Sequence, residues 1–393
     1  MVSWKLVQKA KQILEKEKGT VHKPWGGKLS ICLIYPNSYY VGMSNLGFQT
    51  VYRSLNAEDD VVCERAFLPN PEDLKEYQQT QTPLFSLESQ KPVSDFDILA
   101  FSISFENDFI NILTLLELAR LPLESRLRSG GFPLVMAGGV AVFLNPEPLS
   151  EFFDLFVLGE AEEVMQDFLE ACRTFLAEKR QDRKEDLLRK LGRIEGIYVP
   201  AFYQVTYGED GRVETIKPEP GIPPRIKRRW IRDLDHFPTR SSLYTSDTEL
   251  KEMGLVEVNR GCPRGCRFCG ACFVYHPFRS RSLSALQSLC EEVLPQEHRV
   301  GLTGTAVSDY SGLLPLCETI LSQQGGISFS SLRVDAITPS LVQCLKASDV
   351  RTVAIAPEAG SDDQPWRRAL QLLRRSCRDR GALRGVDPGR TEC

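Results

Sequence analysis

The stretch "NRGCPRGCRFCGAC" (residues 259–272) places four cysteines within eleven positions, among glycines, arginines and a proline. It follows the apolar run "GLVEV" (254–258), which is typical of a buried strand. Cys262, Cys266 and Cys269 form a CxxxCxxC pattern, which we expect to lie on one compact loop. Three thiolates on such a loop can hold three irons of a [4Fe-4S] cluster and leave the fourth iron open to a small ligand.

The residues just before and between these cysteines fit the same interpretation. Two glycines and a proline allow the backbone to wrap closely, and three arginines offset the thiolate charge: Arg260, Arg264 and Arg267. Structural zinc is the alternative. Zinc normally takes four ligands arranged as two separated pairs, whereas one pair overlaps the next here. Cys272 is a spare ligand, a redox thiol or a small neighbour of the cluster, and we favour the last.

Composition limits the class of protein. The 393 residues suffice for two or three domains, and 42% hydrophobic with 25% charged residues is the usual mixture of a globular protein. A formal net charge of -4 gives no overall field that would hold a nucleic-acid backbone. No run approaches the roughly 20 apolar residues of a membrane span. We therefore expect a cytoplasmic protein without a membrane partner.

Eight further cysteines are scattered singly along the chain. In a reducing compartment disulfides are rare, so we interpret these eight as small buried apolar side chains. They are Cys32, Cys63, Cys172, Cys290, Cys317, Cys344, Cys377 and Cys393.

Before the cluster, an amphipathic helix at the N-terminus is followed by apolar runs that alternate with helical stretches. The runs are "LSICLIY" (29–35), "DILAFSIS" (97–104), "PLVMAGG" (133–139) and "FDLFVLG" (153–159). Runs that are apolar throughout predict strands buried on both faces, and so a doubly wound parallel sheet. Ligands bind such a sheet beyond the carboxyl ends of its strands. Gly138 and Gly139 there mark either a ligand approach or a tight turn, and no GxGxxG motif follows the first strand.

Residues 180–258 are less regular, with a charged helical segment and two strands around "GIYVPAFYQVTYGEDGRVETI". Prolines and a basic run then indicate an extended connection. The basic residues are Arg225, Lys227, Arg228 and Arg229. A solvated linker is the favoured interpretation of this run, and an RNA contact is the alternative.

The pattern CxxxCxφC, with Phe268 as the aromatic residue, resembles the radical S-adenosylmethionine (SAM) superfamily. From about residue 25 to 361 the chain is similar to the branch with an N-terminal cobalamin-binding-like domain. The similar pieces include "YPNSYYVGMSNLGFQTVY", "FDILAFSISFEN", "GGVAVFLNPEPLSEFFDLFVLGEAEEV", "EVNRGCPRGCRFC", "SLRVDAIT" and "IAPEAGS". The expected fold is thus an α/β chain: a Rossmann-like sheet followed by a partial (β/α) radical SAM barrel.

The resemblance implies a mechanism and a set of site residues. The open iron would chelate SAM, and one electron from the reduced cluster would release a 5'-deoxyadenosyl radical that abstracts hydrogen from an unknown substrate. Phe268 would lie near the adenine, and Thr303 and Gly304 near the methionine moiety. Arg333 and Glu358, ending the third and fourth strands, would contact the SAM carboxylate and its ammonium or ribose. Ordinary surface salt bridges are the alternative for these two.

Cobalamin is a further candidate cofactor, although relatives that bind it through a DxHxxG motif need a histidine, and residues 23–235 contain none. An empty or repurposed domain is the alternative. The chain also departs from the close branch after the third cysteine, where it has Gly270, Cys272 and the pair His276–Pro277.

We expect four segments. Residues 1–180 form the N-terminal helix and the cobalamin-binding-like Rossmann domain, 181–250 a connecting segment, 251–360 a radical SAM core of about four βα units, and 361–393 an anomalous tail. This tail has eight arginines and no lysine. We interpret it as out of frame, and the barrel as truncated.

The leading hypothesis is a radical SAM iron-sulfur enzyme reduced by a protein such as flavodoxin or ferredoxin. One alternative is a catalytically inactive, truncated relative that acts as a binding protein. The other is a zinc-bearing RNA-binding module that uses the basic run.

Overall fold

A computed structural model describes residues 2–128, 130, 132–177, 184–330, 332–350 and 353–356. Two units divide the chain. The N-terminal unit comprises Met1–Arg232 and Ser242–Lys251, and the C-terminal unit comprises Asp233–Ser241 and Glu252–Cys393. The segment from 361 onward, which the sequence marks as anomalous, lies outside the described residues, as does Glu358.

The N-terminal unit is built on a six-stranded sheet in which the first five strands run parallel and the sixth is antiparallel to its neighbour. In spatial order the strands are β2 (Val61–Phe67), β1 (Leu29–Tyr35), β3 (Ile98–Ser102), β4 (Leu134–Gly138), β5 (Leu155–Val157) and β6 (Ile197–Tyr198). All seven residues of β1 are buried, as expected of a strand covered on both faces.

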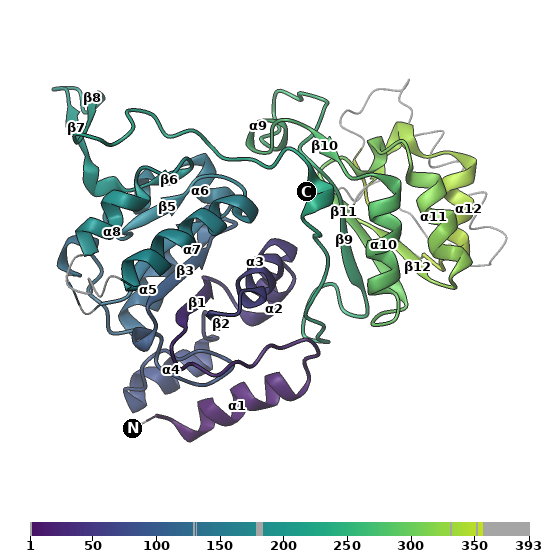
Figure 1. The fold of residues 1–393 in the computed structure, drawn as a ribbon. Coiled ribbons are helices and arrows are strands. Elements are labelled where there is room, and N and C mark those ends of the chain that lie inside the picture. The colour runs from purple at the N-terminus through teal and green to yellow at the C-terminus, as the bar shows by residue number, and fades with distance from the viewer. Residues whose placement is uncertain are drawn as a thin grey trace. The chain divides into compact units, whose positions relative to one another are not determined.

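Helices cover both faces of this sheet (Figure 1). They are α1 (Trp4–Glu15), α2 (Tyr39–Met43), α3 (Leu46–Ala57), α4 (Pro71–Thr80), α5 (Phe109–Leu118), α6 (Val140–Leu144), α7 (Ala161–Ala177) and α8 (Lys184–Leu191). Alternate residues of β1 enter two different cores. Ile31 and Leu33 pack with α3 and α7, whereas Cys32 and Ile34 pack with α1 and α5. The helices that follow β1 and β3 therefore lie on opposite faces of the sheet. The switch point of this doubly wound sheet is thus at the carboxyl ends of β1 and β3.

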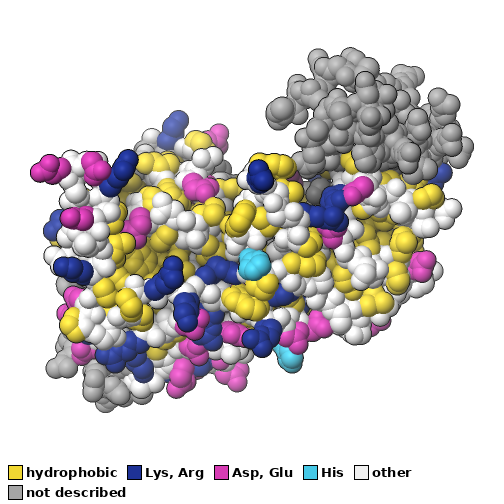
Figure 2. Space-filling model, turned by 90° about the horizontal axis from the view of Figure 1, so that it is seen from above, with side chains coloured by type: hydrophobic (Ala, Val, Ile, Leu, Met, Phe, Trp, Pro, Cys, Tyr) yellow, Lys and Arg dark blue, Asp and Glu magenta, His cyan; other side chains and the backbone are white. Residues whose placement is uncertain are grey.

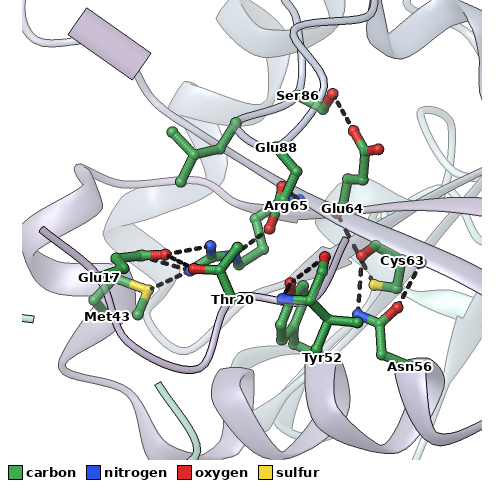
Figure 3. Close-up of polar contacts among 12 residues, drawn as sticks. Glu17, Thr20, Met43, Tyr52, Asn56, Cys63, Glu64, Arg65, Ser86 and Glu88 are labelled. Atoms are coloured by element: carbon green, nitrogen blue, oxygen red, sulfur yellow. Dashed lines mark hydrogen bonds and ion pairs between the residues drawn. The ribbon is translucent and has the colours of Figure 1, made fainter. Parts of the chain in front are cut away.

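The edge strand β2 carries two buried charged residues, Glu64 and Arg65. The Arg65 guanidinium donates to both carboxylate oxygens of Glu17, at 2.9 and 2.7 Å, and to Glu88 at 2.7 Å (Figure 3). Glu17 follows α1 and Glu88 precedes β3, so the ion pairs fasten two connecting segments to the edge strand. Inward-pointing charge on an edge strand also discourages pairing with a second chain.

After α8 and β6, the chain forms a hairpin of β7 (Tyr203–Tyr207) and β8 (Val213–Pro218). The basic run that follows is partly engaged by its own unit. The Arg229 guanidinium pairs with Asp167 and, at 3.5 Å, with Glu163 on α7, and the Arg229 backbone forms a bridge to Gly159. A Cβ on Gly159 would lie 2.2 Å from the Arg229 carbonyl oxygen, so this close approach requires glycine.

The C-terminal unit contains a four-stranded sheet and a separate pair of short parallel strands. The sheet order is β10 (Arg279–Ser280), β9 (Gly254–Arg260), β11 (Arg299–Gly304) and β12 (Gly326–Phe329); the separate pair is β13 (Leu332–Arg333) with β14 (Ile355–Ala356). Strands β9, β11 and β12 are parallel, and β10 is antiparallel to β9.

Three helices pack on this sheet through a single apolar core (Figure 1). They are α10 (Leu283–Val293), α11 (Leu313–Ser322) and α12 (Pro339–Ala347), and the short α9 (Ala271–Val274) follows Cys269 and contains Cys272. The Ser282 hydroxyl caps α10, and the Thr338 hydroxyl caps α12, where Pro339 occupies the first turn. Buried Cys290, Cys317 and Cys344 belong to this core, as the sequence predicted.

The predicted fold class is confirmed. A doubly wound, mostly parallel sheet precedes a unit in which strand and helix alternate as in part of a (β/α) barrel. Figure 2 shows basic and acidic side chains interspersed on the face that it draws, which accords with the small net charge. Among the described residues, no helix is both long and apolar enough to cross a membrane.

Candidate functional site

The cysteine loop (residues 261–270) leaves the carboxyl end of β9 and continues into α9, before β10 returns along β9. The loop begins at Gly261, whose φ is +82°. A Cβ at this position would lie 2.5 Å from the carbonyl oxygen of Tyr275, so the turn requires glycine both for its dihedral angle and for space. The sequence places this glycine directly before the first cysteine of the motif.

All three motif cysteines carry free thiols on this loop. Cys266 is exposed, and Cys262 and Cys269 are half-buried. The Cys269 N–H donates to the Cys266 carbonyl at 3.1 Å, so the CxxC portion is a turn. Cys272 directs its thiol to the Cys269 carbonyl oxygen at 3.5 Å.

Three free thiols that reach solvent within eight residues are the donor chemistry that an iron-sulfur cluster requires. In the conformation described, however, no group of three His, Cys, Asp or Glu side chains among the described residues is placed to hold a metal ion. The residue types thus fit the group, while the loop of this structure is not a closed coordination site.

Arg260, which the sequence suggested would offset thiolate charge, pairs with Glu257 on the same strand. Its Nε and Nη2 donate to the two Glu257 carboxylate oxygens at 3.0 and 2.8 Å, and Arg281 adds a bond at 3.0 Å. Burial alone would raise the pKa of Glu257, but the charges of Arg260 and Arg281 outweigh it and hold that pKa below its ordinary value. Arg264 and Arg267 are exposed on the cysteine loop itself.

The carboxyl end of β11 contacts β9, and the loop after β11 contacts the start of the cysteine loop. The Thr303 hydroxyl donates to the Val256 carbonyl at 3.4 Å, and the Thr305 hydroxyl donates to the Gly261 carbonyl. Gly304 has φ of +153°, and a Cβ there would lie 2.6 Å from Asn259 Oδ1. The structure therefore brings the predicted residues Thr303 and Gly304 next to the strand that delivers the cysteines.

Arg333 ends the short strand β13 and is bound to two carboxylates. Its Nη1 donates to Asp309 at 2.9 Å, and its Nη2 pairs with Asp335. Asp309 also accepts from Arg264 of the cysteine loop. Hydrogen bonding from Arg264 and the charge of Arg333 hold the pKa of Asp309 below its ordinary value. Arg333 is thus connected to the cysteine loop through one carboxylate.

Phe268 stands apart from this network, with 78% of its surface exposed. The sequence did not reveal the role of Asp309 or that of the Asn259 side chain. The Asn259 amide forms hydrogen bonds with both the N–H and the carbonyl of Ala306. The signal available for Asn259 was its position at the end of a strand just before the motif. Nothing local distinguished Asp309, because its partners lie 45 and 24 residues away.

A second polar cluster lies at the switch point of the N-terminal sheet, in the loops after β1 and β3. Asn37 donates to Asp108 Oδ1 at 2.7 Å, and Asn111 donates to the same oxygen at 3.4 Å and to the Pro36 carbonyl at 2.9 Å. Burial raises the pKa of Asp108. In the loop after β4, a Cβ on Gly139 would lie 2.3 Å from the Ile103 carbonyl oxygen. Close backbone packing therefore requires glycine at Gly139, whereas a Cβ on Gly138 would come no closer than 3.7 Å to Val157.

Comparison with known proteins finds a matching family model and a similar protein. Residues 47–200 match a family described as radical SAM proteins, N-terminal. This match lies within the N-terminal unit, does not include the cysteine loop, and supports assignment to the radical SAM superfamily. An uncharacterized protein of Methanocaldococcus jannaschii is 27% identical over 365 residues, which cover 91% of this chain. The chain spans 66% of the length of that relative.

Proposed function

We propose that the protein is a radical SAM enzyme in which Cys262, Cys266 and Cys269 hold a [4Fe-4S] cluster. The single observation that carries the proposal is a loop with three free thiols at the carboxyl end of β9. The family match over residues 47–200 supports it independently, because that match lies in a different part of the chain. When bound, a reduced [4Fe-4S] cluster supplies the electron that cleaves SAM to methionine and a 5'-deoxyadenosyl radical.

The chain's own residues would bind and orient SAM. The carboxyl end of β11, with Thr303 and Gly304, lies against the end of β9, where Asn259 fills the space that a side chain at position 304 would need. Phe268, exposed on the cysteine loop, offers an aromatic surface for the adenine ring. Arg333 offers a cation for the carboxylate of SAM, but would first have to exchange one of its present carboxylate partners.

Glu358 completes the proposed set of SAM-binding residues and lies outside the described residues.

The reductant is proposed to be a small flavin or iron-sulfur protein. The second substrate, from which the radical abstracts hydrogen, is proposed to enter from the exposed side of the cysteine loop. Cobalamin is proposed only for the switch point of the N-terminal sheet. Retention of hydroxocobalamin through desalting supports that part, and recovery at background level removes it.

Metal analysis of protein purified and reconstituted without oxygen tests the cluster. We expect about four irons and four sulfides per chain, and a change in the electron paramagnetic resonance spectrum of the reduced cluster when SAM is added. Stoichiometric zinc without sulfide would instead favour the zinc-bearing module. Iron without any spectral response to SAM would favour an inactive relative.

A further inference from the structure

One carboxylate joins the cysteine loop to the strand that carries Arg333. Asp309 lies at the end of the single-turn helix Val307–Asp309, directly after the β11 loop. Arg264, between the first and second motif cysteines, pairs with Asp309 through Nη2 and approaches its other oxygen through Nε at 3.4 Å. Arg333 donates to the same carboxylate at 2.9 Å. The Asp309 side chain is 11% exposed, so both cations converge on a mostly covered anion.

Apart from the bond of the Thr305 hydroxyl to the Gly261 carbonyl at its start, the cysteine loop has few other attachments. Residues 264–268 are all exposed. Within residues 262–269, the hydrogen bonds to other described residues are the turn from Cys269 to Cys266, the contact from Cys272 and the pair of Arg264 with Asp309. Of these, only the Arg264 pair reaches beyond the loop and the helix that follows it. Asp309 therefore makes the polar contact that fixes the middle of the loop to the rest of the unit.

We propose that Asp309 is a positioning residue that holds the cysteine loop at the carboxyl edge of the C-terminal sheet through the series Arg264–Asp309–Arg333. Without this carboxylate, two cations would face each other and the loop would be restrained by its two ends alone. The consequence for iron binding rests on the function proposed above. The restraint of the loop itself does not.

The chain provides a matched control. Asp335 also pairs with Arg333, but it is 51% exposed, and within the described part of the chain its charge acts on Arg264 only at a distance, without a hydrogen bond or ion pair. Asp309→Asn and Asp335→Asn each remove one charge from the same arginine. Only Asp309→Asn is expected to release the cysteine loop, because only Asp309 binds Arg264 in the described structure. Comparing the two variants therefore distinguishes loss of the loop restraint from loss of a partner of Arg333.

Limited trypsin digestion of the cluster-free protein is the first test, with cleavage after Arg267 measured by mass spectrometry. We expect Asp309→Asn to accelerate this cleavage roughly two- to fivefold, the range for loss of a partly exposed ion pair, and Asp335→Asn to leave it unchanged. Arg264→Gln should reproduce the effect, and the double variant should be no faster than either single variant. Equal rates in Asp309→Asn and the native protein would overturn the proposal. So would a matching rise after Lys346 within α12, because it would indicate unfolding of the unit.

Iron retention is the second test. After reconstitution, Asp309→Asn should lose iron to a chelator faster than both the native protein and Asp335→Asn, and equal loss from the two variants would contradict a role specific to the loop. If the native chain takes up no iron, the proposed function fails, while the trypsin experiment still decides the role of Asp309.

Discussion

The side chain of Asn259 holds the backbone of Ala306 through two hydrogen bonds. Its Nδ2 donates to the Ala306 carbonyl at 2.8 Å, and its Oδ1 accepts from the Ala306 N–H at 3.1 Å. Asn259 is almost fully buried at the end of β9. This amide therefore fixes the loop after β11 against the strand that leads into the cysteines.

Replacing Asn259 with alanine should destabilise the C-terminal unit by about 1–3 kcal/mol, because both backbone groups of Ala306 would lose their partners in a buried site. Urea unfolding followed by hydrogen exchange in β9 and β11 measures the change. Asn107→Ala, at an exposed position, is the control. A loss below about 0.5 kcal/mol, the range of ordinary surface substitutions, would contradict the bracing role of the amide.

The four clustered cysteines should differ in their contribution to iron binding. Serine at position 262, 266 or 269 should reduce the iron retained after reconstitution to a small fraction of the native value, because each thiolate is proposed to hold one iron. Cys272→Ser should retain the native iron content, since its thiol contacts the Cys269 carbonyl oxygen in the structure. Iron loss in Cys272→Ser equal to that in Cys266→Ser would mean that the ligand set has been misassigned.

Arg65→Met should destabilise the N-terminal unit by about 3–5 kcal/mol, because it leaves Glu17 and Glu88 buried without their cation. Arg173→Met is the matched control. Arg173 also pairs with two carboxylates, Glu58 and Asp60, but it is 32% exposed, and its loss should cost at most about 1 kcal/mol.

The free energy of urea unfolding, measured for both variants, decides this prediction. Adding Glu17→Gln to Arg65→Met should restore part of the loss, since one uncompensated charge is then removed. Equal effects of Arg65→Met and Arg173→Met would show that the buried network contributes no more than a surface pair.

Stability of the C-terminal unit should fall in acid through Glu257. Its pKa is held below the ordinary value of 4.5 in the folded state, so its contribution is complete above that value and is lost as the pH falls through the lower, folded-state pKa. Unfolding measured between about pH 6 and pH 3 should show a steeper decline for the native protein than for Glu257→Gln. Glu292→Gln, which removes a half-exposed carboxylate paired with Arg240, should keep the native slope. Parallel curves for the native protein and Glu257→Gln would refute the assignment.

Much of the fold could be predicted from short apolar runs. The run at 29–35 is continuous, and β1 occupies those same residues with every position buried. Strand β2 was not predicted, because Glu64 and Arg65 interrupt its pattern. Their burial depends on partners from distant segments, Glu17 among them, and local sequence does not reveal such pairing.

The position of the cysteine loop could be predicted from the sequence, but the partners of its side chains could not. The spacing of the cysteines, with Gly261 before them, indicated a tight loop after a strand, and the loop lies there. The partners of the loop arginines depend on tertiary structure. Arg260 turns back to Glu257, and Arg264 reaches Asp309 across the sheet edge.

The formation of 5'-deoxyadenosine would show whether this chain carries out the proposed radical chemistry. Protein reconstituted without oxygen would be reduced with dithionite in the presence of SAM, and the product quantified by mass spectrometry against a Cys266→Ala variant treated identically. We expect 5'-deoxyadenosine from the native chain and background levels from the variant. If the native chain carries a full complement of iron and sulfide yet forms no more 5'-deoxyadenosine than Cys266→Ala, the protein is not the radical SAM enzyme that we propose.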